Sequence, residues 1–93
     1  MKKYEIMYVL RPNLEDEARN VLIGKLHDKL AIDGEIENIN EWGLRDLAYE
    51  IDKEKKGYYV VVTLNASSTT GINEFDRVAK INKEVIRHGI FRI

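Results

Sequence analysis

Residues 57–66 read GYYVVVTLNA, and this stretch decides the fold. Its side chains alternate between two faces, which is the period of a β-strand. One face carries Tyr58, Val60, Val62 and Leu64, and the other carries Tyr59, Val61 and Thr63. Because both faces are largely apolar, we expect this strand to lie in the centre of its sheet.

The amino-terminal segment, residues 2–11, repeats this pattern and is expected to form a second central strand. Pro12 ends the strand because proline has no N–H for the ladder. Asn13 is expected to cap a helix whose first turn is acidic, as the helix dipole favours. Asp33 and Gly34 are expected to close this helix. Its apolar stripe would consist of Leu14, Ala18, Val21 or Leu22, Leu26 and Leu30.

Strand periodicity returns over residues 35–51 and changes phase at Trp42 and Gly43, which indicates a β-bulge. After residue 66 a polar loop leads to a second helix, which Thr69 or Thr70 is expected to cap. The apolar stripe of this helix would contain Ile72, Phe75 and Val78 or Ala79.

A last strand is expected over residues 85–93. The order β-α-β-β-α-β predicts an α+β ferredoxin-like sandwich, in which two helices cover one face of a four-stranded antiparallel sheet. With 93 residues, the chain is expected to form a single domain over residues 1–93.

The composition narrows the classes of function. The chain has no cysteine, so disulfides, thiolate metal sites and cysteine nucleophiles are excluded. His27 and His88 have no second ligand at metal-binding spacing, so we expect neither a metal nor a cofactor. No apolar run is long enough for a membrane span, and a cytosolic protein is expected. The formal net charge of −1 implies that any RNA contact comes from a local basic cluster or is shared with a more basic partner.

The predicted sheet leaves one face without helices. The two central strands would present there Met7, Val9, Tyr59, Val61 and Thr63. A contiguous apolar patch of this kind is typical of a docking surface. Between the second and third strands, residues 52–56 read DKEKK, which predicts a charged tip on a long arm that reaches away from the domain.

Three segments resemble one known family. They read KYEIMYVLRPNL (3–14), WGLRDLAYEIDKEKKGYYVV (42–61) and EFDRVAKINKEVIRHGIFR (74–92). They are similar, in the same order, to segments of the bacterial small-subunit ribosomal protein six family, and the likeness covers essentially the whole chain. The chain departs from the family pattern at Leu44, often basic there, at Glu50, often proline, and at Gly89, usually apolar.

The resemblance implies a structural component of the bacterial small ribosomal subunit, in the cytoplasm, rather than an enzyme. Its partners would be the central domain of small-subunit ribosomal RNA and small-subunit ribosomal protein eighteen, with which the family forms a heterodimer. No small-molecule substrate and no membrane are implied. A basic partner would supply most of the attraction to phosphate that this nearly neutral chain lacks.

The first and last strands should be neighbours, so that basic groups from both share one edge. This edge patch is expected to contact RNA through Lys2, Lys3, Tyr4, Arg87, His88 and Arg92. In the hairpin, Arg45 is expected to contact RNA or the partner, with a cross-strand salt bridge as the alternative. Lys53 and Lys56 complete the candidate RNA contacts, although a mixed-charge tip is also typical of a solvated turn.

The open face and the hairpin supply the candidate contacts to protein eighteen. They are Met7, Val9, Trp42, Leu47, Tyr49, Tyr59 and Val61. Trp42 also suits a purely structural role at the bulge.

Other proteins with this order of elements offer three alternatives. An RNA-recognition motif begins its third strand like Lys56-Gly57-Tyr58, but the stacking aromatic that should follow is Val60 here. An enzyme of acylphosphatase type needs a glycine-rich anion loop, whereas residues 11–13 read Arg-Pro-Asn, and the proline lacks a donor. A ligand-sensing regulatory domain remains open and would be expected as a dimer that binds a small molecule.

Overall fold

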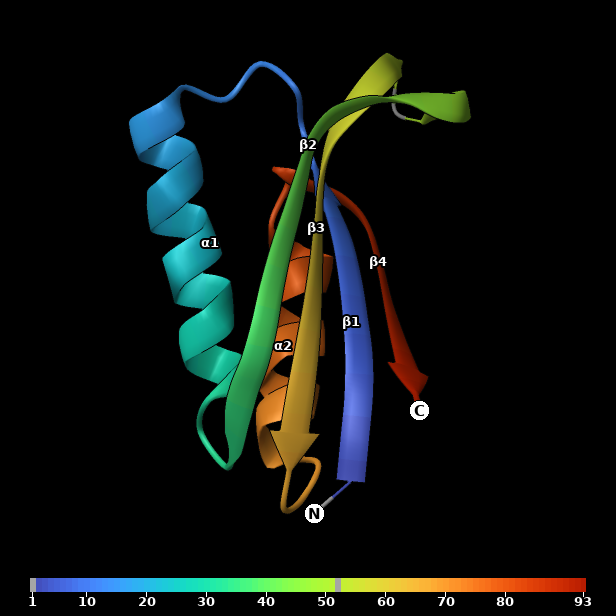
Figure 1. Cartoon of the computed structure of the whole chain (residues 1–93). Helices are drawn as coiled ribbons and strands as arrows, with labels where there is room; N and C mark the ends of the chain where they lie inside the picture. The colour runs from blue at the N-terminus through green and yellow to red at the C-terminus, as the bar shows by residue number, and fades with distance from the viewer. Residues whose placement is uncertain (1, 52) are drawn as a thin grey trace.

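The computed structural model describes residues 2–51 and 53–93. The elements are β1 (Lys2–Leu10), α1 (Asp16–Leu30), β2 (Gly34–Ile51), β3 (Glu54–Ala66), α2 (Thr70–Ile81) and β4 (Val85–Arg92). The strands form one antiparallel sheet in the order β2-β3-β1-β4, and both helices lie on the same side of it (Figure 1). The predicted ferredoxin-like sandwich, with β1 and β3 central, is confirmed.

The core lies between the sheet and the two helices. Alternate residues of the central strands, such as Ile6 and Tyr8 on β1 and Val62 on β3, are fully buried there, as the strand period requires. Leu26 of α1 and Phe75 of α2 close this layer from the other side. Neither helix in the described part of the chain is long and apolar enough to cross a membrane.

Helix α1 differs from the expectation at its start, and of the two alternatives Val21 and Leu22 only Leu22 is buried. Glu15, not Asn13, is the N-cap residue, because the chain still turns at Asn13 on its way from the sheet to the helix layer. The buried stripe runs through Leu22 and Leu26. At about 100° per residue, Val21 points away from this stripe, and it is 69% exposed.

Helix α2 is capped by a residue far away in sequence. Thr69 is the N-cap residue, as expected, but its side chain makes no capping hydrogen bond. Instead, the carboxylate of Asp33 accepts hydrogen bonds from the backbone N–H groups of Thr70 (3.2 Å) and Gly71 (3.0 Å). A Cβ at Gly71 would lie 2.7 Å from the carbonyl oxygen of Lys29, so this glycine lets the two helix ends approach closely.

The long hairpin of β2 and β3 bends toward β4 (Figure 1). Its register shifts between Glu41 and Gly43, where Gly43 has a φ of +83°, and the predicted bulge is confirmed. A larger shift lies between Asp46 and Ile51. The predicted long arm is therefore not straight, because its end curves toward β4, where Tyr49 contacts Arg87.

The predicted charged tip is shorter than residues 52–56. Glu54, Lys55 and Lys56 belong to β3, and Lys53 has a positive φ of 67° at the turn. Asp52 lies outside the described residues.

Candidate protein and RNA contact surfaces

The open face of the sheet carries a row of apolar side chains on its central strands. Met7 of β1 pairs with Val61 of β3, and Tyr59 lies two residues along on the same face. All three are half-buried in the free chain, so each retains surface that a partner can cover. The part of the predicted docking patch around Met7, Tyr59 and Val61 is therefore present.

Val9 was expected in this patch, but it is only 1% exposed and offers no surface to a partner. Its side chain fills the space above Gly57, where a Cβ would collide with it. Leu47 Cδ2 and Ile86 Cδ1 lie 3.5 and 3.6 Å from the position of that Cβ. The bend of the hairpin therefore turns this end of the open face into a second, small core.

Trp42 extends the apolar surface onto β2. Its ring stacks on that of Tyr59, with 6.0 Å between the centroids and 13° between the planes. The guanidinium of Arg45 lies 5.6 Å from the Trp42 centroid, within reach of a cation–π contact. The bulge at Gly43 sets this arrangement, and Trp42 remains 44% exposed. Trp42 therefore both belongs to the bulge and forms part of the exposed apolar surface.

The end of the hairpin adds two more candidate partner contacts. Leu47 is half-buried against the small core, whereas Tyr49 is exposed. The hydroxyl of Tyr49 accepts a hydrogen bond from Arg87 of β4 (3.1 Å). Tyr49 therefore bridges the hairpin to the far edge of the sheet.

A polar zone bounds the apolar surface near the start of β1. Glu37 forms an ion pair with Lys3 (3.3 Å) and accepts a hydrogen bond from Asn65. The hydrogen bond from Asn65 and, secondly, that from Lys3 lower the pKa of the Glu37 carboxyl, so it stays charged. An apolar centre with a polar rim is the usual anatomy of a protein interface.

The predicted basic edge patch is divided by the pleat of the sheet. Facing residues of paired strands share a face, and Val9 faces Arg87 while Tyr8 faces His88. Arg87 therefore lies on the open side and His88 on the helix side. His88 is hydrogen-bonded to Asp76 (2.8 Å), with 17% of its side chain exposed. The expectation that His88 joins a common RNA-binding edge is therefore wrong.

The other members of that patch are spread along β1. Arg92 faces Tyr4 on the helix side, and Lys2 lies near them at the exposed strand end. Lys3 and Arg87 share the open face, but Arg87 faces Val9, six residues from Lys3 along β1. At about 3.3 Å per residue this separation is roughly 20 Å. The structure thus divides the expected patch into a group at the strand ends, Lys2, Lys3 and Arg92, and a single cation, Arg87, near the hairpin.

The hairpin cations differ in how far they are neutralised. Lys56 lies 3.9 Å from a carboxylate oxygen of Asp46, and both side chains are largely exposed. Lys53 is exposed at the turn. Among described residues no ion pair joins Arg45 to a carboxylate, so its charge is available beside Trp42.

Tyr58, which begins the segment similar to an RNA-recognition motif, does not lie on the open face. Tyr58 faces the helices, where its hydroxyl donates to Glu41 (2.7 Å) and the Arg19 guanidinium lies 4.2 Å from its ring centroid. It therefore forms no base-stacking platform on the open face. Within residues 2–51 and 53–93, no cluster of three or more His, Cys, Asp or Glu side chains could hold a metal ion.

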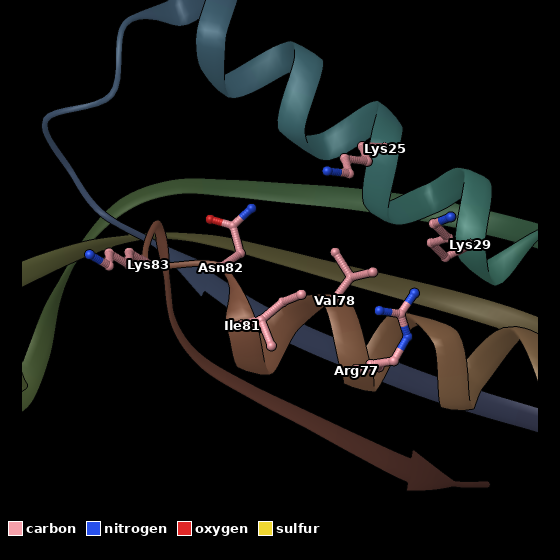
Figure 2. Close-up of a pocket in the computed structure, with 7 residues that line it drawn as sticks. All are labelled: Lys25, Lys29, Arg77, Val78, Ile81, Asn82 and Lys83. Atoms are coloured by element: carbon pink, nitrogen blue, oxygen red, sulfur yellow. The ribbon is translucent and has the colours of Figure 1, made fainter.

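One basic feature was not found from the sequence. A groove of about 590 Å³ runs between the helices on the side away from the open face (Figure 2). It is lined by Lys25, Lys29, Arg77, Val78, Ile81, Asn82 and Lys83. The available signal was the spacing of Lys25 and Lys29, since residues four apart lie on one face of a helix.

Comparison with known proteins is consistent with this geometry. The family model described as ribosomal protein S6 matches residues 3–92 of the chain. Among solved structures, the crystal structure of 30S ribosomal protein S6 from Thermotoga maritima superposes with a TM-score of 0.92 at 28% sequence identity. The match covers 99% of this chain and 87% of that chain.

Proposed function

The chain belongs to the ribosomal protein S6 family, and from this premise we propose that it binds the central domain of small-subunit ribosomal RNA as a heterodimer with small-subunit ribosomal protein eighteen. As a member of this family it is a component of the small ribosomal subunit in the cytoplasm. The whole chain acts as one scaffold domain, without catalysis, cofactor or small-molecule substrate.

The observation that carries the proposal is the apolar surface of the open face. Its centre is formed by Met7 and Val61, and the stacked pair of Tyr59 and Trp42 extends it to β2. Aromatic residues and methionine at the centre of a patch are enriched in protein interfaces. We assign this surface to protein eighteen, together with the hairpin residues Leu47 and Tyr49. Val9 is left out because it is buried.

The RNA contacts are assigned to exposed cations, and to the half-buried Tyr4 beside them, on two sides of this surface. One group stands at the strand ends and the other on the hairpin. Together they comprise Lys2, Lys3, Tyr4, Arg45, Lys53, Lys56, Arg87 and Arg92. His88 is left out because it is paired with Asp76 on the helix side. With a net charge of −1, the chain alone should bind RNA weakly, and a basic partner should supply the remaining attraction.

The test is a titration of a central-domain fragment of small-subunit ribosomal RNA with this chain, with protein eighteen, and with the mixture, at two salt concentrations. We expect weak binding by each protein alone and tight, salt-sensitive binding by the mixture. A mixture that binds no better than its components would refute the heterodimer. Tight binding of short single strands by the chain alone would favour the RNA-recognition alternative. A homodimer that binds a small molecule would favour the sensor.

A further inference from the structure

We propose that the groove between α1 and α2 binds phosphates of the RNA backbone, so that the protein has a second RNA-binding surface on the side opposite the open face. The inference rests on the proposed function, because it requires ribosomal RNA to lie next to the protein in the subunit. It adds a site on the helices, where none of the RNA contacts assigned above lies.

The lining of the groove is unusually basic for a chain of this net charge. Four of its seven residues are cationic, namely Lys25 and Lys29 on α1, Arg77 on α2 and Lys83 just beyond it, and none is acidic. Figure 2 shows the Arg77 guanidinium turned toward α1. The groove thus has a positive wall on each side.

Most of this charge is not neutralised by the protein. Arg77 is paired with Glu74 (2.7 Å), which takes up part of its charge. In the described part of the chain, no ion pair joins Lys25, Lys29 or Lys83 to a carboxylate. These lysines therefore retain charge for an anion from outside.

Folding alone gives little reason for this arrangement. Lys25 and Lys29 stand four residues apart on one helix, where like charges repel. The helix dipole and the charge of Glu74 on α2 both favour Lys29, which lies in the last turn of α1, but not Lys25 near the middle. A spacing of four residues is unfavourable for two lysines, so binding of an external anion explains the presence of Lys25 and Lys29 better than folding does.

Backbone phosphate is the anion that fits the groove best. The groove is open along the helices, and helices in contact stand about 8–10 Å apart, so cations on both walls can follow a strand that carries several charges. Lysine binds phosphate as a point charge on a flexible stem and needs no fixed geometry. The exposed Ile81 adds apolar surface for the sugars between phosphates.

The first test compares two double variants in RNA binding by the mixture with protein eighteen. Lys25→Gln with Lys29→Gln removes two groove charges. The matched control, Lys55→Gln with Lys80→Gln, removes the same net charge from sites outside the groove. Lys80 loses only an exposed ion pair with Asp76, which contributes little to stability.

We expect the groove variant to bind more weakly than the parent. Its slope of log K against log salt should be less steep by about two, whereas the slope of the control variant should change little. Since each phosphate contact contributes a slope of about −0.9, the affinity ratio of parent to groove variant should shrink roughly tenfold between about 50 and 200 mM salt. Equal slopes for the parent and the groove variant, or equal losses in both variants, would overturn the groove while leaving the proposed function intact.

The second test does not depend on the heterodimer. A photoreactive benzoylphenylalanine replaces Ile81 in one variant and Phe91, exposed on the open side of β4, in the other, and both are assembled into small subunits. We expect position 81 to crosslink to ribosomal RNA. Crosslinking at position 81 to protein only, or no crosslink there while position 91 reacts, would refute the groove even if the mixture binds RNA. If instead the mixture fails to bind RNA but position 81 crosslinks to it, the heterodimer proposal fails and the groove stands.

Discussion

Val61→Glu is the substitution that separates docking from folding most clearly. Val61 lies in the middle of the open face, between Met7 on β1 and Asn40 on β2. It is half-exposed, so a glutamate carboxylate there can reach water in the free chain. Loss of a β-branched side chain at such a position costs about 1 kcal/mol or less. The isolated variant should therefore remain folded.

The same carboxylate is far more costly once a partner covers the face. A charge that is buried without a partner costs about 3–5 kcal/mol. At about 1.4 kcal/mol per tenfold change, affinity for protein eighteen should fall by about two to four orders of magnitude. Isothermal titration calorimetry of the two proteins measures this loss, and circular dichroism shows whether the variant is folded.

Val21→Glu is the matched control, because it is the same chemical change at an exposed position on α1. It should leave both folding and affinity for protein eighteen unchanged. If the Val61 variant is folded and binds protein eighteen as tightly as the Val21 variant does, the open face is not the docking surface and the reasoning above is wrong.

Three further substitutions test the cap, the core and a proposed RNA contact. Asp33→Ala removes the acceptor for the first N–H groups of α2 and should lower the melting temperature at neutral pH. The hydrogen bond from Ser68, followed by those from the backbone, lowers the pKa of Asp33, so its stabilisation is present above the ordinary value of 3.8 and is lost as pH falls through the lowered pKa. Melting curves of parent and variant should therefore converge in strong acid, and a constant difference would contradict this assignment. Phe75→Ala should reduce the free energy of unfolding by about 3–5 kcal/mol in urea titrations, since the ring is fully buried against Tyr8; a loss below about 1 kcal/mol would be inconsistent with this packing. Arg45→Gln should leave the melting temperature unchanged and reduce the salt slope of RNA binding by the mixture by about one; an unchanged slope would remove Arg45 from the RNA contacts.

The topology could be predicted because it depends on local periodicity. Two strands that are apolar on both faces had to be central, and the two helices then had to cover the same side of the sheet. The bulge was visible as a change of phase beside Gly43, whose positive φ suits glycine. These features are encoded within a few residues of where they appear.

The features that sequence reasoning missed depend on contacts between distant residues. Asp33 caps a helix that begins 37 residues later, and no local pattern pairs them. Alternation placed Val9 on the open face correctly, but it did not show that Gly57 leaves room for its side chain. His88 was grouped with Arg87 because the first and last strands were expected to share one edge, yet adjacent strand residues point to opposite faces.

The central claim is that protein eighteen covers the open face of the sheet. NMR chemical-shift mapping of this chain, free and bound to protein eighteen, tests it most directly. We expect the largest shifts at Met7, Tyr59 and Val61 and at the Trp42 indole, with α1 and α2 nearly unchanged. Shifts concentrated on the helices, with the open face unaffected, would contradict it.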